Sequence, residues 1–73
     1  MYHTMIREEM ARIGRVGAYP PHEVEAFMRL EHPTLDALSA SQFRAEVATS
    51  LARLDTMDAT ERAAFADSMG CRT

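Results

Sequence analysis

Residues 39–54, SASQFRAEVATSLARL, carry the strongest helical signal in the chain. Ser39 and Gln42 have the spacing of a capping box, in which each side chain bonds the backbone N–H of the other residue, and this predicts a helix over 40–54. Its large apolar side chains recur on one side at helical spacing: Phe43, Val47, Leu51 and Leu54. Three alanines beside them form a smooth face that another helix could approach: Ala45, Ala48 and Ala52. We expect this segment to be the central element of the fold.

Two helices are expected before this segment, over 4–16 and 21–32. Gly17 is the preferred left-handed end of the first helix, because glycine adopts that backbone conformation without a steric penalty. Prolines bound the second helix. Pro20-Pro21 opens it, because proline is tolerated in a first helical turn, and Pro33 ends it.

A fourth helix is expected over 59–69, where Asp58 and Glu61 repeat the capping-box spacing and Gly70 closes the helix. The tail, 70–73, is expected to be flexible. No segment alternates with the two-residue period of a strand. The predicted fold is therefore all-α. We expect a single helical domain over 1–73, built as a small bundle of three to four short antiparallel-type helices.

The chain is short and has no covalent cross-link to support it. Its 73 residues suffice for one small domain with a thin core, and 47% apolar with 26% charged residues is the composition of a folded chain. Cys71 is the one cysteine, so no internal disulfide can form. No stretch is apolar and long enough for a signal sequence or a membrane span. We expect a cytoplasmic protein that does not enter the membrane.

No group of residues has the pattern of a catalytic, cofactor-binding or metal site. His22 and His32 lie at opposite ends of one expected helix, about 15 Å apart at 1.5 Å per residue, so one ion cannot bind both. Cys71 lies in the expected flexible tail, where nothing holds a nucleophile in place. We therefore expect no enzymatic activity, no cofactor and no metal ion.

The first expected helix carries more apolar surface than a short helix needs for docking. Its stripe consists of Tyr2, Met5, Ile6, Met10, Ile13 and Val16. Tyr and Met are enriched at interfaces between proteins, and a small domain with a thin core gains stability by association. We expect a larger protein to bind here, with a second copy of the chain as the other option. The candidate contact residues are Tyr2, Met5, Met10 and Val16.

Charge and composition narrow the kind of partner. The net charge is −3, and all eight basic residues are arginine, which is typical of GC-rich coding in a bacterium or its mobile elements. An acidic surface could compete for a groove that binds nucleic acid. The candidate residues for such a surface are Glu23, Glu25, Glu31, Asp36 and Glu46.

The main functional hypothesis is a small, non-enzymatic protein–protein interaction module that regulates or inhibits a larger bacterial protein. Phage-encoded inhibitors such as anti-CRISPR proteins often have a similar size and charge, and the analogy is one of size and charge only.

The alternative is a small dimeric DNA-binding transcription regulator that uses the arginines of the first helix. These arginines are Arg7, Arg12 and Arg15. Glu8 stands four residues before Arg12, which predicts an exposed ion pair between them. Nucleic-acid binding normally needs a concentrated basic face, because phosphate contacts supply most of the nonspecific affinity. The sequence supplies no such face and does not favour nucleic acid as a partner.

Two charged residues, Glu31 and Arg62, interrupt the apolar faces of their helices. A buried charge without a partner is very costly. We therefore expect these residues to pair with each other, or Glu31 to pair with Arg44, across a helix interface. Otherwise one of them is left for an external partner.

Overall fold

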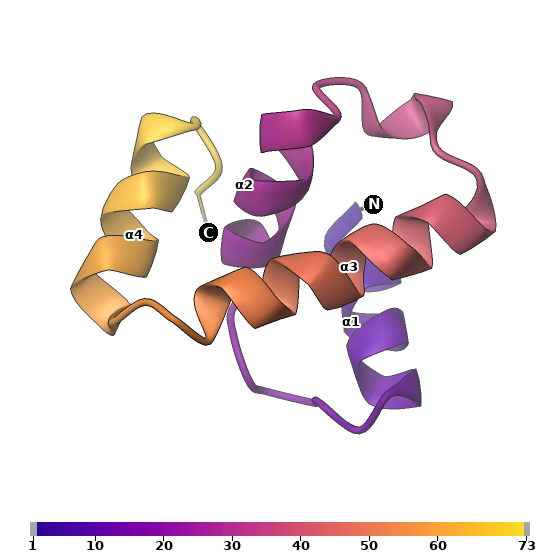
Figure 1. Cartoon of the computed structure of the whole chain (residues 1–73), viewed down its shortest axis with the longest axis horizontal. Coiled ribbons are helices and arrows are strands. Elements are labelled where there is room, and N and C mark those ends of the chain that lie inside the picture. Colours follow the sequence, from indigo (N-terminus) through magenta and orange to yellow (C-terminus); the bar gives the residue numbers. More distant parts are fainter. Residues whose placement is uncertain (1, 73) are drawn as a thin grey trace.

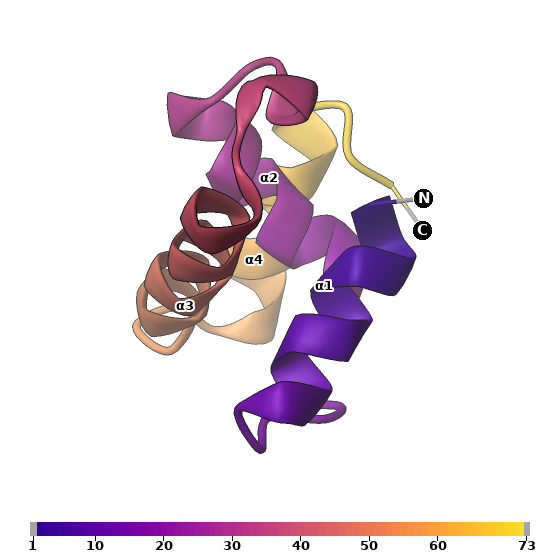
Figure 2. The same cartoon turned by 90° about the vertical axis from the view of Figure 1, so that its right-hand side faces the viewer.

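The helix Pro21–Glu31 (α2) lies in the middle of the fold, and the other three helices pack against it. Figure 1 shows α4 on one side of α2 and α1 on the other, and Figure 2 shows α2 between α1 and α3. The computed structural model describes residues 2–72, and within that range it contains helices and no strand, so the fold is all-α as predicted. The other elements are α1 (Tyr2–Arg12), the short 3₁₀ helix η1 (Leu35–Ala37), α3 (Ala40–Leu54) and α4 (Ala59–Ser68).

The prediction that 40–54 is the central element is wrong, because α2 occupies that position. Val24 and Met28 of α2 have no exposed surface and pack in the main core, which α1 and α3 share. Ala26, on the same helix, is equally buried but belongs to a second cluster with Ala66 and Cys71. Burial on two sides is what places α2 between the other helices.

The apolar side of α3 forms much of the main core, as its spacing predicts. All four of its large apolar residues are buried there: Phe43, Val47, Leu51 and Leu54. The alanine face beside them, by contrast, is exposed, and no helix of residues 2–72 covers it: Ala45, Ala48 and Ala52. Because α1 and α4 both pack against α2, neither is positioned to cover that face.

Both predicted capping boxes are confirmed, and they set the first residues of α3 and α4. The Gln42 N–H donates to Ser39 Oγ at 3.2 Å, and the Ser39 N–H donates to Gln42 Oε1 at 2.8 Å. Asp58 and Glu61 make the same reciprocal pair at 2.9 and 3.0 Å. These hydrogen bonds satisfy backbone donors that have no partner within the helix.

The first helix ends at Arg12, earlier than the predicted 16, because Gly14 rather than Gly17 terminates it. Gly14 has a positive φ of 77°. Its N–H donates to Ala11 O at 3.2 Å, and the Arg15 N–H donates to Met10 O at 2.7 Å. This pair of bonds is a Schellman motif, which satisfies the last carbonyls of a helix. Gly17, with φ of 74°, lies in the following turn.

The predicted flexible tail is instead packed at Cys71. Gly70, with φ of 74°, closes α4 as predicted, and the Cys71 N–H then donates to Ala66 O at 2.9 Å. This turn directs the chain back toward α2, where Cys71 is 7% exposed and lies against Ala26. Arg72 remains exposed and pairs with Asp67, and Thr73 lies outside the described residues.

Truncating the central helix should destabilise the protein strongly. Met28→Ala removes a side chain with no exposed surface, so the free energy of unfolding should fall by about 2–5 kcal/mol. Leu30→Ala is the matched control on the same helix, because Leu30 is 49% exposed, and its effect should stay below about 1 kcal/mol. Urea denaturation followed by circular dichroism measures both values, and equal losses would contradict the central position of α2.

Candidate interaction surfaces

The apolar stripe of the first helix divides between the core and the surface. Ile6 and Met10 are buried in the main core, at 0% and 2% exposure. The candidate role of Met10 as a partner contact is therefore wrong, because its side chain is already enclosed. Three other residues of the stripe are exposed in part or in large part: Met5 at 39%, Ile13 at 38% and Val16 at 76%.

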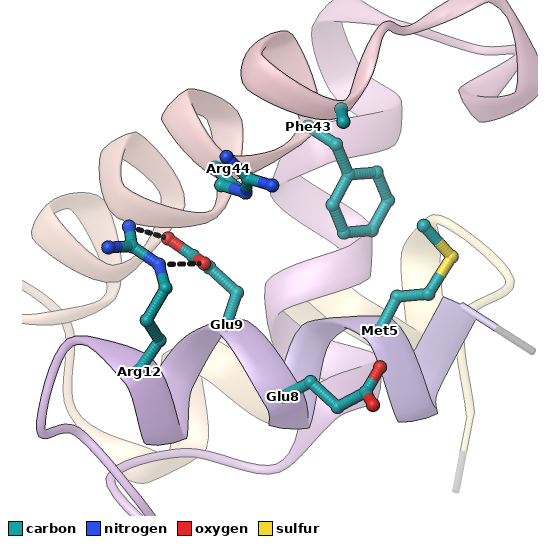
Figure 3. Close-up of a pocket in the computed structure, with 7 residues that line it drawn as sticks. Met5, Glu8, Glu9, Arg12, Phe43 and Arg44 are labelled. Carbon is teal, nitrogen blue, oxygen red and sulfur yellow. Dashed lines mark hydrogen bonds and ion pairs between the residues drawn. The ribbon is translucent and has the colours of Figure 1, made fainter.

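A groove of about 290 Å³ runs between α1 and α3. We call it the α1–α3 groove, and it is lined by Met5, Glu8, Glu9, Arg12, Ala40, Phe43 and Arg44. Figure 3 shows Met5 and Phe43 at one end of the groove and Arg12 with Glu9 at the other. Arg44 lies on the α3 side of the groove. The groove thus combines an apolar end with a charged end.

Glu9 is the buried charge of this groove, with 6% of its surface exposed. Arg12 Nε and Nη2 donate to its two carboxylate oxygens at 2.7 and 2.6 Å. These bonds hold the pKa of Glu9 below its ordinary value, although burial acts in the opposite direction, and the charges of Arg12 and Arg44 add to the lowering. The predicted pair of Arg12 with Glu8 is wrong, because the Arg12 guanidinium is bound to Glu9 instead.

Tyr2 closes the apolar end of the groove from the side of η1. Its ring stacks with that of Phe43 at a centroid distance of 6.4 Å, and its hydroxyl donates to Asp36. A second cavity, between Tyr2 and Leu38, shares Met5, Ala40 and Phe43 with the α1–α3 groove. The apolar end therefore continues from α1 to η1, and Tyr2 forms part of its wall.

An apolar cavity of about 340 Å³ lies between α1, the loop that follows it and the first residue of α2. We call it the Val16 surface, and it is lined by Arg7, Met10, Ala11, Val16, Gly17, Tyr19 and Pro21. Val16 is the most exposed large apolar residue of 2–72. Arg7 lies at the same cavity, is exposed, and forms no ion pair with any residue in that range.

The three candidate arginines do not form one basic face. Arg12 is bound to Glu9, and Arg15 Nη2 donates to Asp55 Oδ1 at 2.8 Å. The Tyr19 hydroxyl donates to the same oxygen at 2.5 Å. Arg15 and then Tyr19 lower the pKa of Asp55 by stabilising its charged form. Of these three arginines, Arg7 is the one that forms no ion pair with a carboxylate among residues 2–72.

Each of the five acidic candidates has a partner within the chain. Glu23 is 6% exposed and accepts from Arg62 Nε at 2.9 Å, so its proposed place on an acidic surface is wrong. The other four pairs are Glu25 with Arg29 and His3, Glu31 with Arg53, Asp36 with Tyr2, and Glu46 with His32.

The predicted pairs of Glu31 with Arg62 or Arg44 are replaced by other pairs within the chain. Glu31 pairs with Arg53 and Arg62 with Glu23. Arg62 also donates to Met57 O at 3.2 Å and lies over the Tyr19 ring at 4.9 Å. Neither charge is therefore left for an external partner.

Among residues 2–72 the structure brings together one group of side chains of the types that bind metals, which the sequence spacing did not indicate. Glu31, His32 and Glu46 place ligand atoms within 4.8 Å of one another. Carboxylate and imidazole groups are ligands for zinc and related cations. Glu31 already accepts from Arg53, so a cation there would compete with that ion pair.

Cys71 lies apart from this group, and burial raises the pKa of its thiol, which reduces its nucleophilic character.

Comparison with protein-family models, with curated proteins and with solved structures found no match to this chain. The assignment of its surfaces therefore rests on the side chains themselves. Across the described range, no helix combines the length and the apolar character needed to cross a bilayer. The longest helix, α3, has 15 residues.

The buried carboxylate of the groove should make stability depend on pH. A group whose pKa is lower in the folded state contributes stability above its unfolded pKa, about 4.3 for Glu, and loses it as the pH falls through the lowered value. Glu9→Gln should therefore lower the urea midpoint at pH 7, and its difference from wild type should narrow below about pH 4. Asp67→Asn removes an exposed carboxylate whose ion pair with Arg72 is itself exposed, and it should leave the midpoint at pH 7 nearly unchanged. Parallel pH profiles for wild type and Glu9→Gln would contradict the assignment.

Proposed function

We propose that the protein is a small, non-enzymatic interaction module that binds a larger bacterial protein in the cytoplasm and regulates or inhibits it. The observation that carries the proposal is the Val16 surface, an apolar cavity beside a valine that is 76% exposed. A small domain with a thin core gains by burying apolar side chains. An exposed valine beside an apolar cavity is therefore the part of the surface that benefits most from a partner.

Fixed neighbours hold Val16 in this exposed position. It follows Arg15, whose guanidinium is bound to Asp55, and precedes Gly17, whose positive φ turns the chain. Tyr19, on the other side of that turn, donates to the same Asp55 carboxylate. Both ends of the loop are thus tied to the end of α3. A loop held in this way loses little conformational freedom on binding, which favours affinity.

The chemistry of the surface describes the partner segment. The cavity is mainly apolar and opens beside Val16, so it fits an aliphatic or aromatic side chain. Arg7 stands beside it without an ion pair to residues 2–72, so it favours an acidic neighbour on the partner. We propose a partner segment with one large apolar residue next to an Asp or Glu.

The pairing of charges favours this proposal over two others. Mimicry of nucleic acid by an acidic surface has less support, because the five acidic candidates have partners within the chain. The analogy with phage-encoded inhibitors, anti-CRISPR proteins among them, then rests on size and net charge. DNA binding by the first helix also has less support, because Arg12 and Arg15 are bound to carboxylates. A row of free arginines is what phosphate contacts would require.

Adding a charge at Val16 should abolish partner binding without unfolding the protein. Val16→Asp places a carboxylate at the cavity, whereas Ala18→Asp makes the same change in the same loop at an exposed residue that does not line the cavity. Immobilised wild type and Ala18→Asp should retain one large protein in stoichiometric amount from a GC-rich bacterial lysate, and Val16→Asp should lose it. The free energies of unfolding of the wild type and the two variants, measured by urea denaturation, should agree within about 0.5 kcal/mol.

Two results would overturn the proposal. Retention of the same protein by Val16→Asp would show that the Val16 surface is not the contact. A mobility shift of duplex DNA by the wild type at low salt, lost steeply as salt is added, would favour the DNA-binding alternative.

A further inference from the structure

We infer that the α1–α3 groove is a contact surface between two copies of this chain, related by a two-fold axis, with Glu8 of each copy paired with Arg44 of the other. The groove is lined by different residues from the Val16 surface. The inference therefore stands or falls independently of the proposed function.

The apolar end of the groove is open although its floor is part of the core. Phe43 is 5% exposed and belongs to the main core, and Met5 lies beside it with 39% of its surface exposed (Figure 3). Ala40 is the other apolar residue that α3 contributes, and its small side chain leaves the space between the helices unfilled. A flexible methionine beside an aromatic ring is well suited to pack against a second protein surface.

The charged residues of the groove separate into a satisfied pair and two remaining charges. Glu9 and Arg12 bind each other through two hydrogen bonds inside the groove. Glu8, on α1, and Arg44, on α3, are exposed and form no ion pair with any of residues 2–72. The groove therefore presents one acid on its α1 side and one base on its α3 side.

This arrangement is complementary to itself. In a two-fold interface the same patch meets its own copy, so a residue that contacts a second residue of the partner is contacted by that second residue in return. Turning the groove onto itself allows Glu8 of each copy to meet Arg44 of the other, which makes two equivalent ion pairs. The ridge of α1 that carries Met5 and Glu8 would then pack along the partner's groove, as ridges pack into grooves between helices.

The two kinds of contact contribute differently. Ion pairs at an exposed rim add little affinity, but they select the register and exclude arrangements in which like charges meet. Burial of Met5 against the partner supplies the favourable apolar contact. A foreign protein would need its own acid and base at matching positions, whereas this chain already carries both. Charge complementarity thus favours a second copy as the occupant of the groove.

Two charge reversals test the pairing directly. Glu8→Arg alone places like charges together at both contacts, and so does Arg44→Glu alone, so each variant should weaken the dimer about tenfold or more. An equimolar mixture of the two variants places an arginine opposite a glutamate at both contacts and should restore a dimer. Sedimentation velocity over a concentration series measures each association constant, and circular dichroism verifies the fold.

Two further variants make the test independent of the charge reversals. Met5→Asp changes an exposed residue at the apolar end and should also abolish the dimer. Val16→Asp should leave the dimer unchanged, since Val16 does not line this groove.

Three results would overturn the inference. The first is a wild type that stays monomeric at the highest concentration. The second is a folded Met5→Asp that dimerises as the wild type does. The third is a mixture of folded charge-reversal variants that does not associate.

Discussion

The burial of α2 on two sides determines where the other three helices lie. Val24 and Met28 join it to α1 and α3, while Ala26 lies against Ala66 and Cys71 at the other cluster. Because Ala26 is small, the chain beyond α4 can lie directly on α2. Charges at the helix ends are satisfied across these contacts, most clearly where Glu23 of α2 accepts from Arg62 of α4. The other three helices are thereby arranged around α2.

This arrangement determines which surfaces remain available. α1 contacts α2 and α3 through its inner side, so apolar residues near its edges remain in contact with solvent. One edge of α1 forms the α1–α3 groove with α3, and another side of α1 forms the Val16 surface with the loop that follows the helix. The few large residues of α4 pack against α2, and the ring of Phe65 stacks on that of Phe27 with the ring centroids 4.4 Å apart. Apolar surface that a larger domain would enclose is here exposed to solvent.

Features encoded by neighbouring residues could be predicted from the sequence, and features created by packing could not. The start of α3 depends on Ser39 and Gln42, three residues apart, so it was predicted to the residue. The end of α1 was predicted too late because Gly14 and Gly17 can both adopt the positive φ that ends a helix. In the structure, the hydrogen bonds that close α1 are made at Gly14 and Arg15. The pair of Glu23 with Arg62 spans 39 residues and exists because α2 and α4 meet. The apolar stripe includes Val16 and Met5, which are exposed, and Met10, which is buried because α2 packs against it, and the stripe alone does not distinguish them.

We propose that the outer part of α1, together with the adjoining side of α3, is the surface through which this protein associates. Amide NMR spectra recorded over a dilution series test this proposal, because each backbone N–H reports on its own surroundings. Concentration-dependent shifts are expected at the amides of Met5, Glu8 and Arg44, while those of α4 and of the exposed alanines of α3 should stay unchanged. Shifts centred on α4 or on that alanine face, or no shifts at any concentration, would contradict it.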